Sequence, residues 1–289
     1  MIKLIASDMD GTLLDKNHGI SEENIAAIKE AESKGIKFAI VTGRSYDDVR
    51  PIIEQYDLDC ECVALNGGAY YDKDGNILEA IYIDKSRVRE ILEVMLKGDF
   101  SVEIYTDKGY YTTNTKEELW SGMLRRSKTF YPHLNEEERI EVAKKNPHFI
   151  SMNYITDIDE FLNSDVKIYK FVTFGETEED VKKLREEVKK VEGVAISASF
   201  TTNIEVNDSK ATKGLILAKV AKDFGMSRDE VMVLGDGLND YSMFEEFTNS
   251  VAMDNAIPEI KEIAKYITDT NNNSGVGKAI IKALNGEIG

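Results

Sequence analysis

The chain has 289 residues, of which 42% are hydrophobic and 31% are charged, and its formal net charge is −17. This length is sufficient for one large or two ordinary domains, each with its own core. The composition is typical of a soluble globular protein. The strongly negative charge argues against a nucleic-acid partner, because phosphate backbones bind basic surfaces.

Neither a secretory signal nor a membrane segment is evident. The apolar stretch 2–6 is too short for a signal peptide and leads directly into a polar motif. No stretch approaches the roughly 18 consecutive apolar residues of a membrane span. The only cysteines are Cys60 and Cys62, and a disulfide between residues two apart would be strained, so we expect both to be reduced. These features predict a cytoplasmic protein without membrane contact and leave its oligomeric state unknown.

The N-terminal part of the chain alternates between strand and helix patterns. Apolar residues predict a strand over 2–7 and another over 36–41. Between them, Ser21 is the N-cap of a helix that ends at Ser33, and Gly35 is its stop signal. Strands joined in this way are parallel, and the ligands of parallel sheets gather beyond the carboxyl ends of the strands.

The middle of the chain, from about residue 84 to 207, has a different pattern. The expected strands are 101–105 and 167–174, and the expected charged helices are 85–97, 135–145 and 177–191. We interpret this segment as an inserted α/β cap domain, with residues 1–83 and 208–289 forming the core domain.

The alternating pattern resumes after residue 210. The predicted elements are a helix over 213–224, a capping box over 227–230, a strand over 231–235, a helix over 239–246, a strand over 250–253, a helix from Pro258, a strand over 266–268 and a helix over 277–284. The core domain is therefore predicted to be α/β, with a Rossmann-like, doubly wound parallel sheet.

Two aspartates, Asp8 and Asp10, follow the first predicted strand. Residues two apart in an extended segment project to the same side, and Gly11 allows a sharp turn after them. This geometry suits covalent phosphoryl transfer, with Asp8 as the nucleophile. Asp10 would be the acid that protonates the leaving oxygen and then the base for water. The same Asp-x-Asp-Gly pattern also occurs in ordinary loops and in calcium sites.

A second acidic cluster, with Asp236 and Asp240, follows the predicted strand 231–235. Mg²⁺ prefers oxygen ligands and keeps several waters, so one or two carboxylates and a phosphate oxygen are sufficient to bind it. Asp8 and Asp236 are the expected ligands of such an ion, which would also shield Asp8 from the negative charge of a substrate. An EF-hand is excluded, because Phe247 stands where a bidentate glutamate would be needed.

Three further polar residues flank predicted strand or helix ends. Thr42 can donate its hydroxyl to a phosphate oxygen or serve as a strand-end or N-cap residue. Lys213 can bring a positive charge to the phosphate or be a solvated lysine in the first turn of a helix. For Arg44, a salt bridge at a helix start and a contact with substrate both remain open.

Four segments together carry a family resemblance. They are Asp8-Met9-Asp10-Gly11-Thr12-Leu13-Leu14, Thr42-Gly43-Arg44, Lys213-Gly214 and Gly235-Asp236-Gly237-Leu238-Asn239-Asp240. In this order they resemble the four motifs of the haloacid dehalogenase-like superfamily, and the match spans nearly the whole chain. The closer similarity is to the Cof-type phosphatases, which carry a large α/β cap of the C2 type between the second and third motifs.

The resemblance implies roles for the acidic residues of these motifs. Asp8 would be the nucleophile and a metal ligand. Asp10 would be the acid and base, with its backbone carbonyl also on the metal. Asp236 would be a metal ligand. Asp240 would be either a further metal ligand or an acidic residue that contacts the ligands and not the metal.

The resemblance also implies contacts with the substrate. The phosphate contacts would be Thr42, Gly43, Lys213 and Asn239. Asn66 and Gly67 resemble a turn that such proteins carry at the mouth of the site, and together with Arg44 they are candidate substrate contacts.

The predicted function is Mg²⁺-dependent hydrolysis of small phosphate monoesters, such as sugar phosphates, through an aspartyl-phosphate intermediate. Within the superfamily, an acid at position 10 favours a phosphatase or phosphomutase over a dehalogenase or an ion-pumping ATPase. A sugar phosphomutase with the same motifs is the first alternative, and a non-catalytic binding or regulatory protein of the same fold is the second. The expected partner is a small phosphorylated metabolite.

Overall fold

A computed structural model describes residues 1–97, 100–131 and 133–289 and divides into two compact units. Unit 1 comprises Met1–Ile81, Ser197–Ser199 and Ser209–Gly289, and unit 2 comprises Tyr82–Ile196 and Phe200–Asp208. The domain boundaries expected from the sequence, after residues 83 and 207, lie close to these limits. The short segment Ser197–Ser199, which was expected in the cap, belongs to unit 1.

Unit 1 is built on an eight-stranded sheet. Its strand order is β14-β13-β12-β1-β2-β3-β4-β5. The six parallel strands are β1 (Leu4–Ser7), β2 (Lys37–Val41), β3 (Cys60–Ala64), β12 (Val231–Gly235), β13 (Asn249–Ala252) and β14 (Tyr266–Ile267). Ala6 lies opposite both Val233 and Ala39, so β1, β2 and β12 end at the same edge of the sheet. This register brings the polar residues that follow the three strands to one place.

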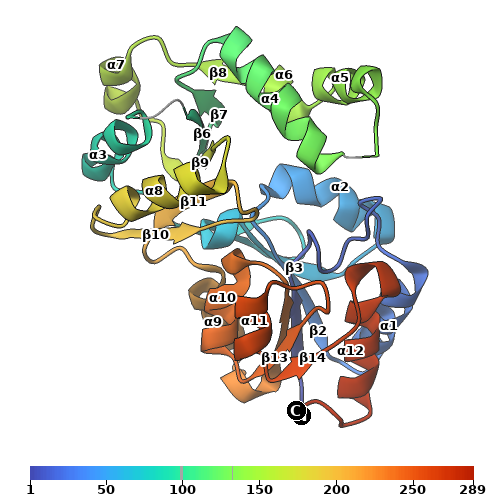
Figure 1. Ribbon diagram of the computed structural model, residues 1–289. Helices are drawn as coiled ribbons and strands as arrows, with labels where there is room; N and C mark the ends of the chain where they lie inside the picture. Colours follow the sequence, from blue (N-terminus) through green and yellow to red (C-terminus); the bar gives the residue numbers. More distant parts are fainter. Residues whose placement is uncertain (98–99, 132) are drawn as a thin grey trace. The chain divides into compact units, whose positions relative to one another are not determined.

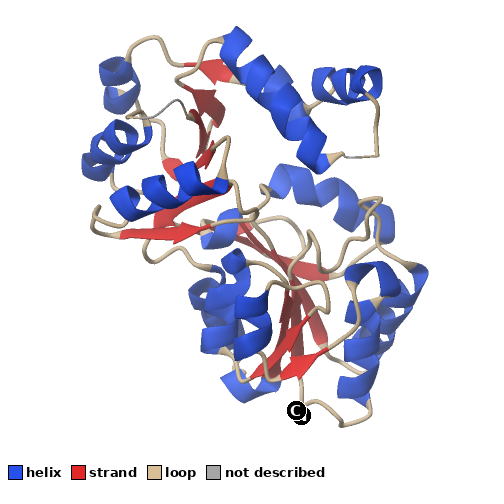
Figure 2. Ribbon diagram, in the orientation of Figure 1, coloured by secondary structure: helices blue, strands red, loops and turns tan. Residues whose placement is uncertain are grey.

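Helices cover both faces of this sheet, as Figure 1 and Figure 2 show. One layer contains α9 (Lys213–Asp223), α10 (Tyr241–Glu246) and α11 (Pro258–Ile263), and the other contains α1 (Glu22–Ser33) and α12 (Gly275–Leu284). Helix α2 (Tyr46–Tyr56) follows β2. Every residue of β1 and β12 is buried, which explains why their residues other than Ser7 and Gly235 are apolar. The predicted Rossmann-like, doubly wound core is confirmed.

Three details of unit 1 differ from the sequence-based expectation. Strands β4 (Ala69–Tyr71) and β5 (Ile77–Ala80) add an antiparallel hairpin, which the sequence did not reveal because β5 is partly exposed and lacks a buried apolar face. The expected helix 239–246 is instead a 3₁₀ turn, η3 (Leu238–Asp240), followed by α10. Helix α12 starts at Gly275 rather than at residue 277.

Unit 2 contains a six-stranded sheet with the order β10-β11-β9-β6-β7-β8. The strands are β6 (Ser101–Thr106), β7 (Gly109–Thr112), β8 (Asn153–Tyr154), β9 (Ile168–Phe174), β10 (Val194–Ser197) and β11 (Asn203–Asp208). The helices are α3 (Lys85–Met95), α4 (Lys116–Phe130), α5 (Glu136–Lys144), α6 (Pro147–Ile150), α7 (Ile158–Asn163) and α8 (Glu178–Val188). This composition agrees with an inserted α/β domain.

The two faces of the unit 2 sheet differ in polarity. One face packs its Val, Ile and Phe side chains against apolar residues of α3, α7 and α8. The alternate residues of the same strands include charged side chains in ion pairs. Lys170 of β9 pairs with Glu205 of β11 at 2.5 Å, and Glu103 of β6 pairs with Arg126 of α4 at 2.7 Å. Because these groups are nearly buried, each needs its partner to offset the cost of desolvation.

Two further expectations concern the cysteines and the membrane. Cys60 and Cys62 are buried in β3 as free thiols, as expected. Among the helices of the described residues, none combines the length and the apolar character needed to span a bilayer.

The contact between α9 and α10 predicts a sensitive position at Gly214. A Cβ atom there would lie 2.1 Å from the Ser242 carbonyl oxygen, so Gly214→Ala should destabilise unit 1 by about 1–3 kcal/mol or more through overpacking. Gly122→Ala is the matched control, because it lies within α4 with no atom closer than 3.6 Å and should gain about 0.5–1 kcal/mol in helix propensity. Urea unfolding of both variants measures the difference. An unchanged midpoint for Gly214→Ala would contradict the close helix approach.

Candidate functional site

The sequence-predicted residues meet in unit 1 at the carboxyl ends of three adjacent strands. Asp8 follows β1, Thr42 follows β2 and Asp236 follows β12. Lys213 reaches the same place as the first residue of α9. Residues that are far apart in the sequence therefore converge at one edge of the sheet, where ligands of parallel sheets bind.

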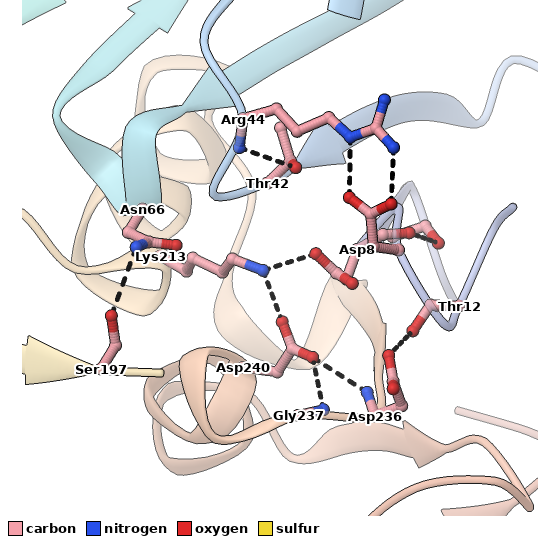
Figure 3. A network of polar contacts seen from close by, with 12 residues as sticks. Asp8, Thr12, Thr42, Arg44, Asn66, Ser197, Lys213, Asp236, Gly237 and Asp240 are labelled. Carbon is pink, nitrogen blue, oxygen red and sulfur yellow. Dashed lines mark hydrogen bonds and ion pairs between the residues drawn. The ribbon is translucent and has the colours of Figure 1, made fainter. Parts of the chain in front are cut away.

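Lys213 lies between two aspartates at the centre of the site. Its Nζ donates hydrogen bonds to Oδ1 of Asp8 at 2.5 Å and to Oδ1 of Asp240 at 2.7 Å (Figure 3). The Lys213 side chain is fully buried, so the alternative of a solvated lysine is wrong. Burial alone would lower the pKa of Lys213, but the charges of Asp240 and Asp8 outweigh it and the pKa is raised. The side chain is therefore an ammonium ion at neutral pH.

Both carboxylate oxygens of Asp240 are engaged. While Oδ1 accepts from Lys213, Oδ2 accepts hydrogen bonds from the backbone N–H groups of Asp236 and Gly237, at 2.9 and 3.0 Å. These bonds close the loop after β12 and explain why η3, rather than an α-helix, follows it. Asp240 thus holds both Lys213 and the backbone at Asp236 in place.

Asp8, Asp236 and Asp240 form a compact acidic group. One carboxylate oxygen from each lies within 4.8 Å of the others. Burial, with the charge of Asp240 adding to it, holds the pKa of Asp8 well above its ordinary value and raises the pKa of Asp236 to about 7. Hard divalent cations bind such sets of oxygen donors, and a bound cation would favour the ionised forms of both carboxyl groups.

Two residues of the first motif shape the surroundings of Asp236. Thr12 Oγ1 donates a hydrogen bond of 2.7 Å to Asp236 Oδ1 (Figure 3). Gly11 adopts a φ of +78°, and a Cβ atom there would lie 2.3 Å from Asp236 Oδ2. Only glycine fits this position, because any side chain would displace the carboxylate. No role for Thr12 was expected from the sequence, although its place in the first motif was a signal.

Asp10 lies apart from this acidic group. Its carboxylate is 44% exposed and accepts two hydrogen bonds from Arg44, at 2.7 Å from Nε and 2.6 Å from Nη2. Asp10 is predicted to bind a metal through its backbone carbonyl, so the position of its side chain does not test that prediction. Arg44 makes its ion pair with Asp10 rather than within the helix that follows it. Burial lowers the pKa of Arg44, but the hydrogen bonds and charge of Asp10 outweigh it and the pKa is raised.

The candidate phosphate contacts lie on three loops. Thr42 is buried, and its Oγ1 accepts a hydrogen bond of 3.2 Å from the backbone N–H of Arg44. Gly43 stands between these two residues, and Asn239 lies in η3. The predicted roles of Thr42, Gly43 and Asn239 in binding phosphate remain predictions.

The predicted turn at the mouth of the site is the 3₁₀ turn η1 (Leu65–Gly67), which follows β3. Asn66 has a left-handed backbone, with a φ of 58°, and its Nδ2 donates to Ser197 Oγ at 3.2 Å. Both residues belong to unit 1, so this bond lies within the core unit. The role of Asn66 and Gly67 as substrate contacts is untested.

A family model for haloacid dehalogenase-like hydrolases matches residues 5–280. The chain belongs to this family. The haloacid dehalogenase-like hydrolase described here is 31% identical over 277 residues to the phosphatase YwpJ of Bacillus subtilis, a match that covers 95% of this chain and 97% of the relative. It is also 31% identical over 286 residues to 5-amino-6-(5-phospho-D-ribitylamino)uracil phosphatase YwtE of Bacillus subtilis, covering 99% of both chains.

A solved structure supports the same assignment. A haloacid dehalogenase-like hydrolase from B. subtilis superposes with a TM-score of 0.85 at 30% sequence identity, covering 97% of this chain and 99% of the other. The predicted membership among Cof-type haloacid dehalogenase-like hydrolases is confirmed, and the chain is an enzyme of the phosphatase type.

The raised pKa of Asp236 predicts a pH-dependent stability. A carboxyl group whose pKa rises on folding binds its proton more tightly in the folded chain, so it destabilises the fold as pH rises from its ordinary value of 3.8 to about 7. As pH rises from 5 to 8, the free energy of unfolding of the metal-free parent should therefore fall relative to that of Asp236→Asn. Urea unfolding in a chelator measures this difference. The exposed Asp74→Asn is the control, and equal slopes for all three proteins would contradict the prediction.

Proposed function

We propose that this chain hydrolyses small phosphate monoesters in a Mg²⁺-dependent reaction that passes through an aspartyl phosphate on Asp8. The observation that carries the proposal is the position of the Asp8 carboxylate. One of its oxygens is held by Lys213, and within the described part of the chain Oδ2 accepts no hydrogen bond. A fixed carboxylate with one available oxygen is suited to act as a nucleophile.

The charge balance of the site supports a divalent cation. The four aspartates named above outnumber the two basic side chains paired with them, Lys213 and Arg44, which leaves two uncompensated negative charges when all are ionised. Oxygen ligands are those that Mg²⁺ prefers. Asp8 and Asp236 are the proposed ligands, with the backbone carbonyl of Asp10, while Asp240 organises Lys213 and the loop. When bound, Mg²⁺ would neutralise charge on the phosphate.

In the first step, an Asp8 oxygen attacks the phosphorus atom, and the bond from phosphorus to the leaving oxygen breaks. Asp10 gives its proton to that oxygen, which leaves as an alcohol. Lys213 stays beside Asp8 and stabilises the negative charge that develops on the phosphoryl oxygens. The products of this step are the aspartyl phosphate and the dephosphorylated alcohol.

In the second step, Asp10 acts as a base. It takes a proton from a water molecule, whose oxygen attacks the phosphorus atom of the aspartyl phosphate. The bond from phosphorus to Asp8 breaks, inorganic phosphate leaves, and Asp10 has recovered its proton. Each side chain thus returns to its starting state.

The substrate class is proposed from the site and from the relatives. The polar groups at the strand ends suit a phosphate group, and the relative YwtE is named for a phosphorylated ribitylamino compound. Sugar phosphates and similar metabolites are therefore the first compounds to test. A phosphomutase would use the same residues but return the phosphoryl group to a sugar.

The decisive experiment measures phosphate release from a panel of phosphate monoesters, with Mg²⁺ and with a chelator. The parent should release phosphate only with Mg²⁺, and Asp8→Asn should abolish release because an amide cannot form the intermediate. Asp74→Asn, the same change on an exposed turn, should behave like the parent. Release that persists in Asp8→Asn would refute the proposal, and isomerised sugar phosphate without free phosphate would identify a mutase.

The acid role of Asp10 predicts a dependence on the leaving group. Asp10→Asn should lower turnover of alkyl phosphates by on the order of 10²- to 10⁴-fold. It should have much less effect on p-nitrophenyl phosphate, whose leaving group needs little protonation. Steady-state rates on both substrates measure the contrast. Equal losses on both would contradict the assigned role.

A further inference from the structure

The ion pair between Arg44 and Asp10 has a geometry that a surface ion pair does not require. Two guanidinium nitrogens bind the two carboxylate oxygens in parallel, at 2.6 and 2.7 Å. Bidentate pairs of this kind fix direction as well as distance. Within residues 1–97, 100–131 and 133–289, Arg44 supplies the only hydrogen bonds to the Asp10 carboxylate. The orientation of Asp10 therefore depends on Arg44.

Arg44 is itself held by the ends of two strands. Its backbone N–H donates to Thr42 Oγ1 at 3.2 Å, and its carbonyl oxygen accepts from the backbone N–H of Leu65 at 2.9 Å. The next residue, Ser45, is the N-cap of α2. The guanidinium group thus projects from a backbone position that is fixed on both sides.

Asp10 lacks comparable support. Its side chain is 44% exposed, and the chain reverses at Gly11 immediately after it. A carboxylate in such a place would rotate about its two side-chain bonds. Proton transfer needs the carboxyl group within hydrogen-bond reach of the reacting oxygen, and a misplacement of about 1 Å costs on the order of 10²-fold in rate.

We propose that Arg44 is a positioning residue, which holds the Asp10 carboxylate in the orientation that serves the leaving oxygen and then water. The proposal rests on the proposed function, in which Asp10 is the acid and base. When one Asp10 oxygen turns to the reacting group, the hydrogen bond to the other oxygen still holds the carboxyl group. In this role Arg44 acts through Asp10, which its Nε and Nη2 bind, rather than through a contact with the substrate.

A double-mutant cycle tests this dependence. Arg44→Ala should lower kcat for an alkyl phosphate by on the order of 10- to 10²-fold, with little change in KM, because orientation is lost but substrate binding is not. It should have little effect on p-nitrophenyl phosphate. Arg44→Lys should restore only part of the loss, since an ammonium group cannot form the bidentate pair. In the Asp10→Asn background, Arg44→Ala should change kcat by less than about 2-fold, since coupled residues are not additive.

Arg50→Ala is the matched control. Arg50 lies on α2, is exposed and pairs with Glu54 in the same helix at 3.4 Å, so its removal should leave all rates unchanged. Circular dichroism and thermal unfolding of each variant separate lost orientation from lost structure.

Two results would overturn the inference. A raised KM for Arg44→Ala in both backgrounds would mean that Arg44 binds the substrate directly. Unchanged rates would mean that the pair is only a surface ion pair. Asp8→Asn shows whether such a result concerns Arg44 alone or the proposed function as a whole. If Asp8→Asn is inactive and the effects of Arg44→Ala and Asp10→Asn on kcat are additive, only the role of Arg44 fails. If Asp8→Asn retains activity, or the parent has none, the proposed function fails and the inference with it.

Discussion

The buried ammonium group of Lys213 is the constraint on which the site depends. A charge removed from water is stable only with partners in good geometry, and leaving one partner out costs several kcal/mol. Lys213 finds its partners in Asp8 and Asp240, at 2.5 and 2.7 Å. Since Asp240 also binds the backbone at Asp236, the same charge connects the loops after β1 and β12 to the start of α9. Apolar packing aligns the strand ends, and this ion triad connects the loops that follow them.

The acidic group of Asp8, Asp236 and Asp240 contributes both to the structure of the site and to its proposed chemistry. Asp8 and Asp236 carry raised pKa values because burial and Asp240 disfavour their charged forms. Lys213 offsets only part of this repulsion. A site with surplus negative charge selects a divalent cation, and a cation then makes an anionic nucleophile acceptable to an anionic phosphate. The net charge of −17 is therefore compatible with a phosphorylated substrate, because the charge balance inside the site, not the surface charge, decides what binds.

The sequence predicted the parts of the fold that leave a local signal. Strand β1, the Ser21 cap of α1 and the position of Asp8 could be read because each depends on neighbouring residues. The β4–β5 hairpin could not, since its partly exposed strand lacks a period-two apolar pattern. In the site, the burial of Lys213 and its bond to Asp8 join residues 205 positions apart, and the Arg44–Asp10 pair joins residues 34 apart. Such pairings are set by packing, which motif spacing does not record.

The strand order of unit 1 has a consequence for how the protein forms during synthesis. Strand β1 lies between β2 and β12, so a strand from the start of the chain pairs with one that follows more than two hundred residues later. All residues of unit 2 have been synthesised once position 208 has left the ribosome, whereas β1 can pair with β12 only after Val231–Gly235 has been synthesised. Long-range strand pairing is slow and leaves apolar edges exposed in the meantime. Asp8, the proposed nucleophile, is synthesised more than two hundred residues before Asp236 and Asp240, which complete its surroundings.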